Sequence, residues 1–221
     1  MPAQQTPHAK PRRAIAAYTL NTFSSLRVRN YRLYFIGQGI SLAGMWMQVL
    51  AQGWLVATLT NSPAMVGLVA ALQFLPVLLF APYGGVIADR FSKRRVLFVT
   101  QSLAGALALV LAALTATGVV RLWMVFALAG LLGIVSALDN PTRQAFVHEL
   151  AGPDELRNAV TLNALEVNFM RMIGPALAGV VIVAIGLPLC FLVNGLTYAA
   201  VLICLVLMNA NELHRSARLR S

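Results

Sequence analysis

Four polar side chains interrupt the apolar run from residue 160 to residue 185: Asn163, Glu166, Asn168 and Arg171. An ionisable group at membrane depth is costly unless it faces a cavity or a partner. Glu166 is therefore a candidate to bind a proton or a cationic substrate, the alternatives being a structural salt bridge or an interfacial position. Arg171 is a candidate to bind an anionic substrate group or to act as a counter-charge in coupling, the alternative being a buried hydrogen-bond hub. Five residues separate the two, roughly 140° around a helix, so they are not expected to pair with each other.

Glutamines form a second set of candidate cavity residues. Gln48 and Gln52 are four residues apart and so share one helix face, and Gln73 is a similar candidate in the next apolar run. Trp46 would supply an aromatic wall for a bulky ligand, whereas Trp54 is expected nearer the outer interface as an anchor. The alternative for the glutamines is hydrogen bonding between helices.

A compact charge cluster lies between two long apolar runs, at residues 84–95. We expect Gly85 to allow close helix approach and Asp89 to end a helix at the inner membrane surface. Three cations then follow in a tight turn: Arg90, Lys93 and Arg94. The simpler alternative is that these charges only mark the cytoplasmic side of the membrane.

The sequence lacks the minimum parts of several enzyme classes. A phosphate-binding loop needs a lysine after a glycine, and neither Lys10 nor Lys93 has one. A second histidine does not follow His148-Glu149 at helical spacing, and the chain has no Gly-x-Ser-x-Gly motif. We therefore expect no covalent catalysis, no cofactor and no metal site. Four polar residues of the same region are expected on a solvated surface helix and assigned to no site: His148, Glu149, Asp154 and Glu155.

The composition is that of a polytopic membrane protein. Hydrophobic residues make up 59% of the 221-residue chain and charged residues 11%, against about 25% in soluble domains. Six apolar runs can each cross about 30 Å of hydrocarbon as a helix: 33–59, 64–88, 96–118, 122–138, 160–185 and 188–208. We expect three parts: a cytoplasmic basic segment (1–32), a six-helix transmembrane domain (33–208), and a basic tail or linker (209–221). Ser62 and Pro63 are expected to cap and begin the second helix.

The distribution of charge predicts the orientation. With the N-terminus inside, 15 of the 17 lysines and arginines fall in inner segments, while Arg121 lies outside and Arg171 within a run. This pattern predicts a multi-pass protein of the inner or plasma membrane, in contact with the lipid bilayer and with both termini cytoplasmic. Because the basic residues lie in short blocks between apolar runs, they do not indicate a nucleic-acid partner. Residues 15–26 are either a helix on the inner membrane surface or a partly disordered tail.

The charge cluster resembles a loop of the major facilitator superfamily. The family pattern is G-x-x-x-D-R-x-G-[RK]-[RK], and five positions match it: Gly85, Asp89, Arg90, Lys93 and Arg94. Ser92 replaces the second glycine. In that family the loop is held to act as an inner-side latch, pairing with an acid at the end of the fourth span and with a helix of the other half. Asp139 lies where that acid is expected, and Arg143 follows it.

Two further stretches resemble the drug and siderophore exporter branch of that superfamily, typified by the enterobactin exporter. They are residues 29–56 and residues 139–179. The resemblance implies the first half of a two-half transporter, an all-α fold of six helices in two inverted three-helix repeats. It also implies secondary active export of a small amphipathic molecule. The second half would be a separate chain, a missing C-terminal half or another copy, and the alternative is a non-transporting remnant or assembly module.

Overall fold

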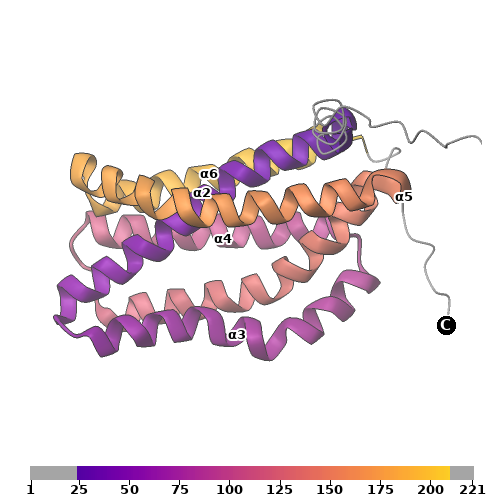
Figure 1. The fold of residues 1–221 in the computed structure, drawn as a ribbon. Coiled ribbons are helices and arrows are strands. Elements are labelled where there is room, and N and C mark those ends of the chain that lie inside the picture. Colours follow the sequence, from indigo (N-terminus) through magenta and orange to yellow (C-terminus); the bar gives the residue numbers. More distant parts are fainter. Residues whose placement is uncertain (1–23, 210–221) are drawn as a thin grey trace, which may run out of the picture.

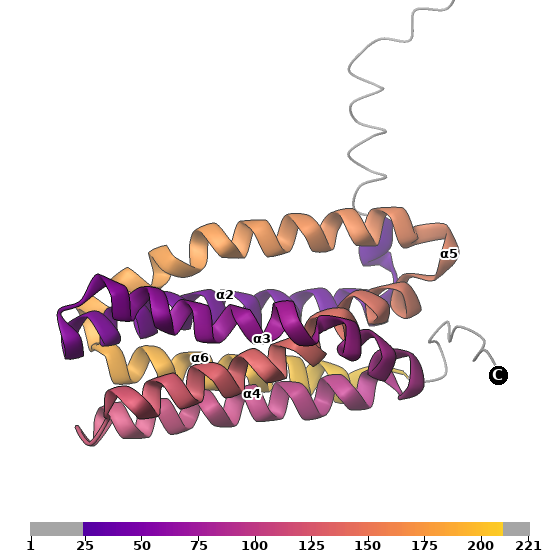
Figure 2. The same ribbon diagram turned by 90° about the horizontal axis from the view of Figure 1, so that it is seen from below.

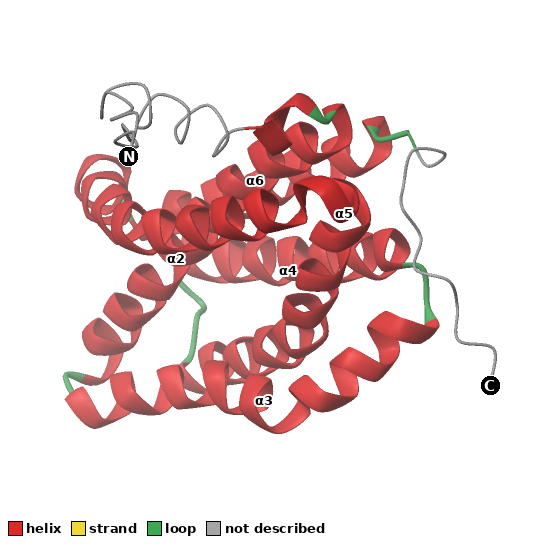
Figure 3. Cartoon of the chain, turned by 45° about the vertical axis from the view of Figure 1, so that its right-hand side comes forward, coloured by secondary structure: helices red, strands yellow, loops and turns green. Residues whose placement is uncertain are grey.

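The computed structural model describes residues 24–209, which are helical nearly throughout (Figure 3). The predicted surface helix at 15–26 and the basic tail lie mostly or wholly outside these residues. A short 3-10 helix, η1 (Ser24–Arg27), precedes five long α-helices: α2 (Arg29–Thr60), α3 (Pro63–Arg90), α4 (Lys93–Ala116), α5 (Leu122–Ile185) and α6 (Leu187–Leu207). Each α-helix is long and apolar enough to cross a membrane.

Local sequence explains where the helices begin and end. The predicted start of the second helix is confirmed: Ser62 is the extended residue before α3, and Pro63 takes the first turn, where its missing N–H is not needed. The Ser62 side chain, however, makes no capping hydrogen bond. Asn61 ends α2 in the left-handed conformation with φ 50°, and Gly186, with φ 89°, separates α5 from α6. Both residue types tolerate positive φ better than most.

The prediction of six separate helices differs from the structure at α5. The fourth and fifth apolar runs belong to one 64-residue element, broken at Gly152, whose φ of 68° and ψ of 176° are not helical. At this break α5 folds back on itself, as Figures 1 and 2 show, so it has a first arm (122–151) and a second arm (153–185). The prediction of a loop and a surface helix after residue 138 is therefore wrong, because the first arm continues for more than three turns beyond that residue.

Small residues set which helices lie side by side. A Cβ atom on Gly84 of α3 would collide with the carbonyl oxygen of Ala137 on the first arm of α5, and one on Gly174 of the second arm would collide with Trp46 of α2. Similarly, Gly105 of α4 lies against Tyr198 of α6. α3 therefore packs on the first arm, α2 on the second arm, and α4 on α6. The close approach assigned to Gly85 belongs to Gly84, since a Cβ on Gly85 would meet no atom within 4 Å.

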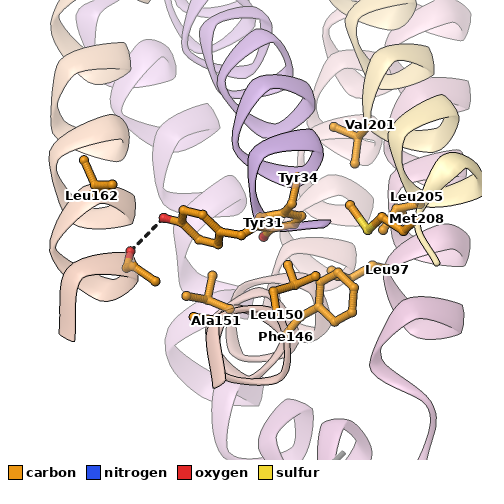
Figure 4. Close-up of a cluster of buried hydrophobic side chains, with 12 residues drawn as sticks. Tyr31, Tyr34, Leu97, Phe146, Leu150, Ala151, Leu162, Val201, Leu205 and Met208 are labelled. Atoms are coloured by element: carbon orange, nitrogen blue, oxygen red, sulfur yellow. Dashed lines mark hydrogen bonds between the residues drawn. The ribbon is translucent and has the colours of Figure 1, made fainter. Parts of the chain in front are cut away.

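Most of the charged residues among residues 24–209 gather at one end of the bundle, which we call the basic end. It comprises the start of α2, the α3–α4 turn, the bend at Gly152 and the end of α6, at the right of Figure 1. A hydrophobic cluster closes the bundle there, with Tyr31 and Tyr34 of α2, Phe146 of the first arm and Leu205 of α6 (Figure 4). The Tyr31 hydroxyl also donates a 2.9 Å hydrogen bond to the Ala159 carbonyl, which ties α2 to the second arm of α5.

The two adjacent glycines of α3 provide a matched test of this packing. We expect Gly84→Ala to destabilise the protein by about 1 to 3 kcal/mol, since the added methyl overpacks a backbone contact. Gly85→Ala should be neutral or stabilising by up to about 1 kcal/mol, because alanine favours helix and the space is open. Thermal unfolding of the two purified variants in detergent measures both, and equal effects would contradict the assigned helix contact.

Candidate functional site

An ion pair lies inside the bundle on the first arm of α5. The Arg143 guanidinium contacts the Asp139 carboxylate one helical turn away, with only 13% and 5% of the two side chains exposed. The Asp139 Oδ1 atom also accepts hydrogen bonds from Thr100 Oγ1 at 2.6 Å and Gln101 Nε2 at 2.8 Å, both on α4. Buried charges are tolerated when they are paired and hydrogen-bonded in this way.

The same network reaches α2. The Ser41 hydroxyl donates a 3.4 Å hydrogen bond to Gln101 Oε1, so α2, α4 and α5 are linked through one carboxylate. Ser41, Gln101 and Asp139 are all buried. Gln101 of α4 therefore joins α2, through Ser41, to α5, through Asp139.

Glu166 brings a second carboxylate to this region from the second arm. Asp139 precedes the bend at Gly152 by 13 residues and Glu166 follows it by 14, so both lie about 20 Å along the helix from the bend. The Glu166 side chain is 6% exposed, and Arg143 is close enough to interact with its charge. Arg143 therefore forms an ion pair with Asp139, and its charge also acts on the buried Glu166 carboxylate.

Glycine at position 39 of α2 makes room for Glu166. A Cβ atom there would lie 2.6 Å from Glu166 Oε1. The other oxygen, Oε2, is buried without a hydrogen-bond partner, as are the Tyr34 hydroxyl and Gln38 Nε2. Buried polar atoms are nearly always satisfied in native proteins, so these three atoms make the surroundings of Glu166 a candidate site. We call the buried side chains of Asp139, Arg143 and Glu166 the charge cluster.

Arg171 occupies a different environment. It is exposed in the second arm, and its guanidinium carbon lies 4.9 Å from the centroid of the Trp46 ring on α2. As expected from their spacing, Arg171 and Glu166 do not pair: Glu166 points into the bundle against Gly39, and Arg171 lies at the surface.

The glutamines lie in helix–helix contacts, the alternative noted above. Gln48 is buried and accepts a hydrogen bond from Asn194 Nδ2 of α6, and Gln52 Nε2 donates to the Val125 carbonyl of α5 at 3.3 Å. Gln73 is also buried, next to Gly133 of α5. The Gln48 and Gln52 side chains therefore join α2 to α6 and α5.

The asparagines of the second arm are not brought into the charge cluster. Asn163 is half-buried, whereas Asn168 is exposed and donates a 2.8 Å hydrogen bond to the Ala164 carbonyl of its own helix. Of the four polar residues that interrupt this run, only Glu166 joins the cluster.

The predicted latch loop is tied to the bundle by Lys93. Its Nζ atom lies 2.8 Å from Glu149 Oε1, and both side chains are largely buried. Arg94 donates a 3.2 Å hydrogen bond to the Val206 carbonyl of α6. Asp89 and Arg90 are exposed at the end of α3, and within residues 24–209 neither forms an ion pair.

Glu149 was missed in the sequence because it was assigned to a solvated surface helix. The structure pairs Lys93 with Glu149, whereas Asp139 lies deeper and pairs with Arg143. The apolar spacing of Phe146, Val147 and Leu150 is the signal that could have revealed a buried helical face continuing through residue 149.

Comparisons with known proteins decide the family. Residues 20–219 match the family model described as transmembrane secretion effector. The chain belongs to the major facilitator superfamily. It is 31% identical over 178 residues to the staphyloferrin A transporter of Staphylococcus aureus, which covers 80% of this chain and 45% of that protein. It is 29% identical over 158 residues to the uncharacterized MFS-type transporter YfiS of Bacillus subtilis, covering 71% of this chain and 37% of that protein.

The family predicted from the 84–95 cluster is therefore confirmed. This major facilitator chain spans less than half the length of the curated relatives it matches. Both relatives are named as transporters, which agrees with a buried charge cluster in an apolar helical bundle. Within residues 24–209, no three metal-ligating side chains of histidine, cysteine, aspartate or glutamate come together.

Proposed function

We propose that this chain forms the first half of a secondary exporter that moves a small amphipathic molecule across the inner or plasma membrane by alternating access. The observation that carries the proposal is the charge cluster, in which the Asp139–Arg143 ion pair and the buried Glu166 carboxylate lie inside an apolar bundle. Ionisable groups are retained at such depth where they serve transport or coupling. Membership of the major facilitator superfamily supports the same conclusion.

The two arms of α5 would each cross the membrane, which gives six crossings in two inverted three-helix repeats. Each arm has about 30 residues, or roughly 45 Å of helix, enough to span the hydrocarbon core. The basic end would be cytoplasmic under the positive-inside rule, since among the described cations Arg121 alone lies at the opposite end. Both termini would then be cytoplasmic.

A second six-helix half would complete the transporter. The relatives are more than twice as long as the matched segment, and transporters of this fold hold substrate between two halves. The second half would come from the remainder of a longer chain, from a separate chain or from another copy of this one. Large apolar side chains on α3 and on the second arm of α5 are exposed in this half and would contact lipid or the second half: Leu78, Leu79, Tyr83, Met172 and Val183.

The α3–α4 turn would act as the inner-side latch. Lys93 and Glu149 hold the start of α4 to the end of the first arm, which would keep the turn in place. Asp89 and Arg90 point their charges outside this half, so they would meet the second half when the inner side closes. In this arrangement Glu149, rather than Asp139, is the acid of the latch.

A charge exchange tests the latch. Lys93→Glu alone would place two carboxylates together and should lower the transport rate at least about tenfold, since like charges repel strongly in a partly buried site. The double variant Lys93→Glu/Glu149→Lys should recover most of the rate because the ion pair is restored. Arg95→Glu, at an exposed position of the same turn, is the control. Failure of the double variant to improve on the single one would contradict the pairing.

Glu166 is the proposed proton carrier of the cycle. Its carboxylate is buried and one oxygen lacks a hydrogen-bond partner, so a proton would neutralise a charge that burial disfavours. Arg143 would then interact with Asp139 alone. When Glu166 loses the proton, it would compete with Asp139 for the same arginine, which gives the bundle two arrangements.

Efflux from cells tests the proposed function. Cells that lack their own exporters would express the chain with and without a supplied second half and be loaded with carboxyfluorescein or rhodamine 6G. We expect efflux of at least one dye from cells with both halves, and a protonophore should stop it. Dye retention identical to that of empty cells, with both halves inserted, would favour a non-transporting module.

A further inference from the structure

Arg171 is an arginine without a carboxylate partner. Within residues 24–209 the two ion pairs are Lys93 with Glu149 and Asp139 with Arg143, and Arg171 takes part in neither. Its side chain is exposed at the surface of the half-bundle. A positive charge is therefore available there to a group outside this half.

The depth of Arg171 rules out an ordinary surface role. It lies 18 residues after Pro153 and 14 before Ile185, about 27 Å and 21 Å from the ends of the second arm. Near the middle of a membrane, an arginine facing acyl chains would be strongly disfavoured. In a two-half transporter, this face of α5 and α2 would instead border the space between the halves, where substrate is held.

Trp46 gives this position the form of a binding site. The guanidinium carbon lies 4.9 Å from the ring centroid, within the range of a cation–π contact. Gly174 lies one turn further along α5 and packs directly on the Trp46 Cβ. A Cβ atom added to Gly174 would lie 3.0 Å from the Ala43 carbonyl oxygen. The two helices are thus in close contact beside the stack, which restricts the Trp46 side chain. A guanidinium over an aromatic ring can still donate N–H groups to an anion.

The neighbouring acids do not neutralise Arg171. Glu166 is turned into the bundle against Gly39, and Asp139 is held by Thr100, Gln101 and Arg143. Asp139 and Glu166 therefore lie inside this half, whereas Arg171 lies on the face toward the proposed cavity. Such a face attracts negative charge.

We infer that the transported molecule carries a carboxylate or a similar oxyanion, which Arg171 binds while Trp46 contacts its apolar or aromatic part. This inference rests on the proposed function, since it assigns the substrate class of that transporter. It separates the roles of the two ionisable residues of the second arm: Arg171 binds substrate and Glu166 carries the proton.

Tryptophan fluorescence of the full chain tests the inference without transport. The chain has three tryptophans, so Trp54→Phe/Trp123→Phe leaves Trp46 as the sole reporter, and both replaced rings are exposed. The purified protein in detergent would be titrated with 4-phenylbutyrate, with the neutral 4-phenylbutyramide and with the cationic 4-phenylbutylamine. We expect a saturable change in Trp46 emission with the carboxylate, and binding at least about tenfold weaker for the amide and the amine, as expected for a lost charged hydrogen bond.

Variants of Arg171 identify the group that binds. Arg171→Gln should remove the preference for the carboxylate, and Arg171→Lys should retain part of it because the charge remains. Unchanged thermal unfolding of Arg171→Gln would show that it is folded, and Arg171→Lys supplies a second variant if it is not. Equal binding of the three probes to the parent protein, or unchanged carboxylate preference in Arg171→Gln, would overturn the inference. In the efflux experiment, export of rhodamine 6G without export of carboxyfluorescein would also overturn the inference of an anionic substrate. That result would leave the assignment as a transporter intact.

Discussion

Replacing Glu166 with glutamine is expected to abolish gradient-driven export while leaving the protein folded. Glutamine has nearly the same size but cannot carry a proton, so the charge cluster would keep one arrangement. Burial of a carboxylate costs several kcal/mol, and each 1.4 kcal/mol corresponds to about a tenfold change in an equilibrium. We therefore expect the rate of proton-driven export to fall at least about tenfold.

Exchange of substrate across the membrane without a gradient should survive in Glu166→Gln, because it needs no proton transfer. The thermal stability of the variant should equal or exceed that of the parent, since a buried carboxylate with an unpartnered oxygen has been replaced. Asp154→Asn is the matched control, as Asp154 is an exposed acid on the same arm. Full proton-driven export by Glu166→Gln would exclude Glu166 as the proton carrier.

Removing Arg143 is expected to produce the largest loss of stability among the substitutions considered. Arg143→Ala would leave the Asp139 carboxylate buried with only Thr100 and Gln101 as partners, and it would remove the cation whose charge also acts on Glu166. Breaking a buried ion pair on one side costs about 3 to 5 kcal/mol. Thermal unfolding in detergent should show this loss, and Arg157→Ala, at an exposed arginine of the other arm, should change stability by less than about 0.5 kcal/mol.

A double variant separates the structural role of Arg143 from its role in transport. Asp139→Asn/Arg143→Met removes both charges of the pair, so most of the lost stability should return. Export should not return, because the arginine that would alternate between the two carboxylates is absent. Recovery of both stability and export would mean that the pair only holds the fold together.

The sequence predicted the helical fold well because apolar runs and charge blocks are long-range patterns. The turn at Ser62 and Pro63 was correctly placed from local capping chemistry. The bend of α5 was not, because Asp139, Asn140 and Pro141 resemble a helix end. The helix nevertheless continues through Pro141, which deprives the Ala137 carbonyl of its N–H donor, and that carbonyl lies against Gly84 of α3. Such a contact depends on tertiary packing.

The charged members of the candidate site could be found in the sequence for a simple reason. Glu166 and Arg171 are conspicuous in apolar surroundings, and Asp139 and Arg143 were indicated by the resemblance to the superfamily's latch. Their partners could not be found, because the rotation of each helix decides whether Thr100, Gln101 or Ser41 reaches the Asp139 carboxylate. The same uncertainty applied to the glutamines, whose spacing is compatible with either a cavity or a helix contact.

Transport by purified protein tests the central claim most directly. The chain would be reconstituted into liposomes alone and with a matched six-helix second half, and a proton gradient would be imposed across the membrane. Movement of carboxyfluorescein and of rhodamine 6G would be followed in each preparation. We predict gradient-dependent movement of carboxyfluorescein when both halves are present, and none when Glu166→Gln replaces the parent chain. Correctly inserted halves that move neither dye, or movement that is the same without a gradient, would contradict the assignment of this chain as half of a proton-coupled exporter.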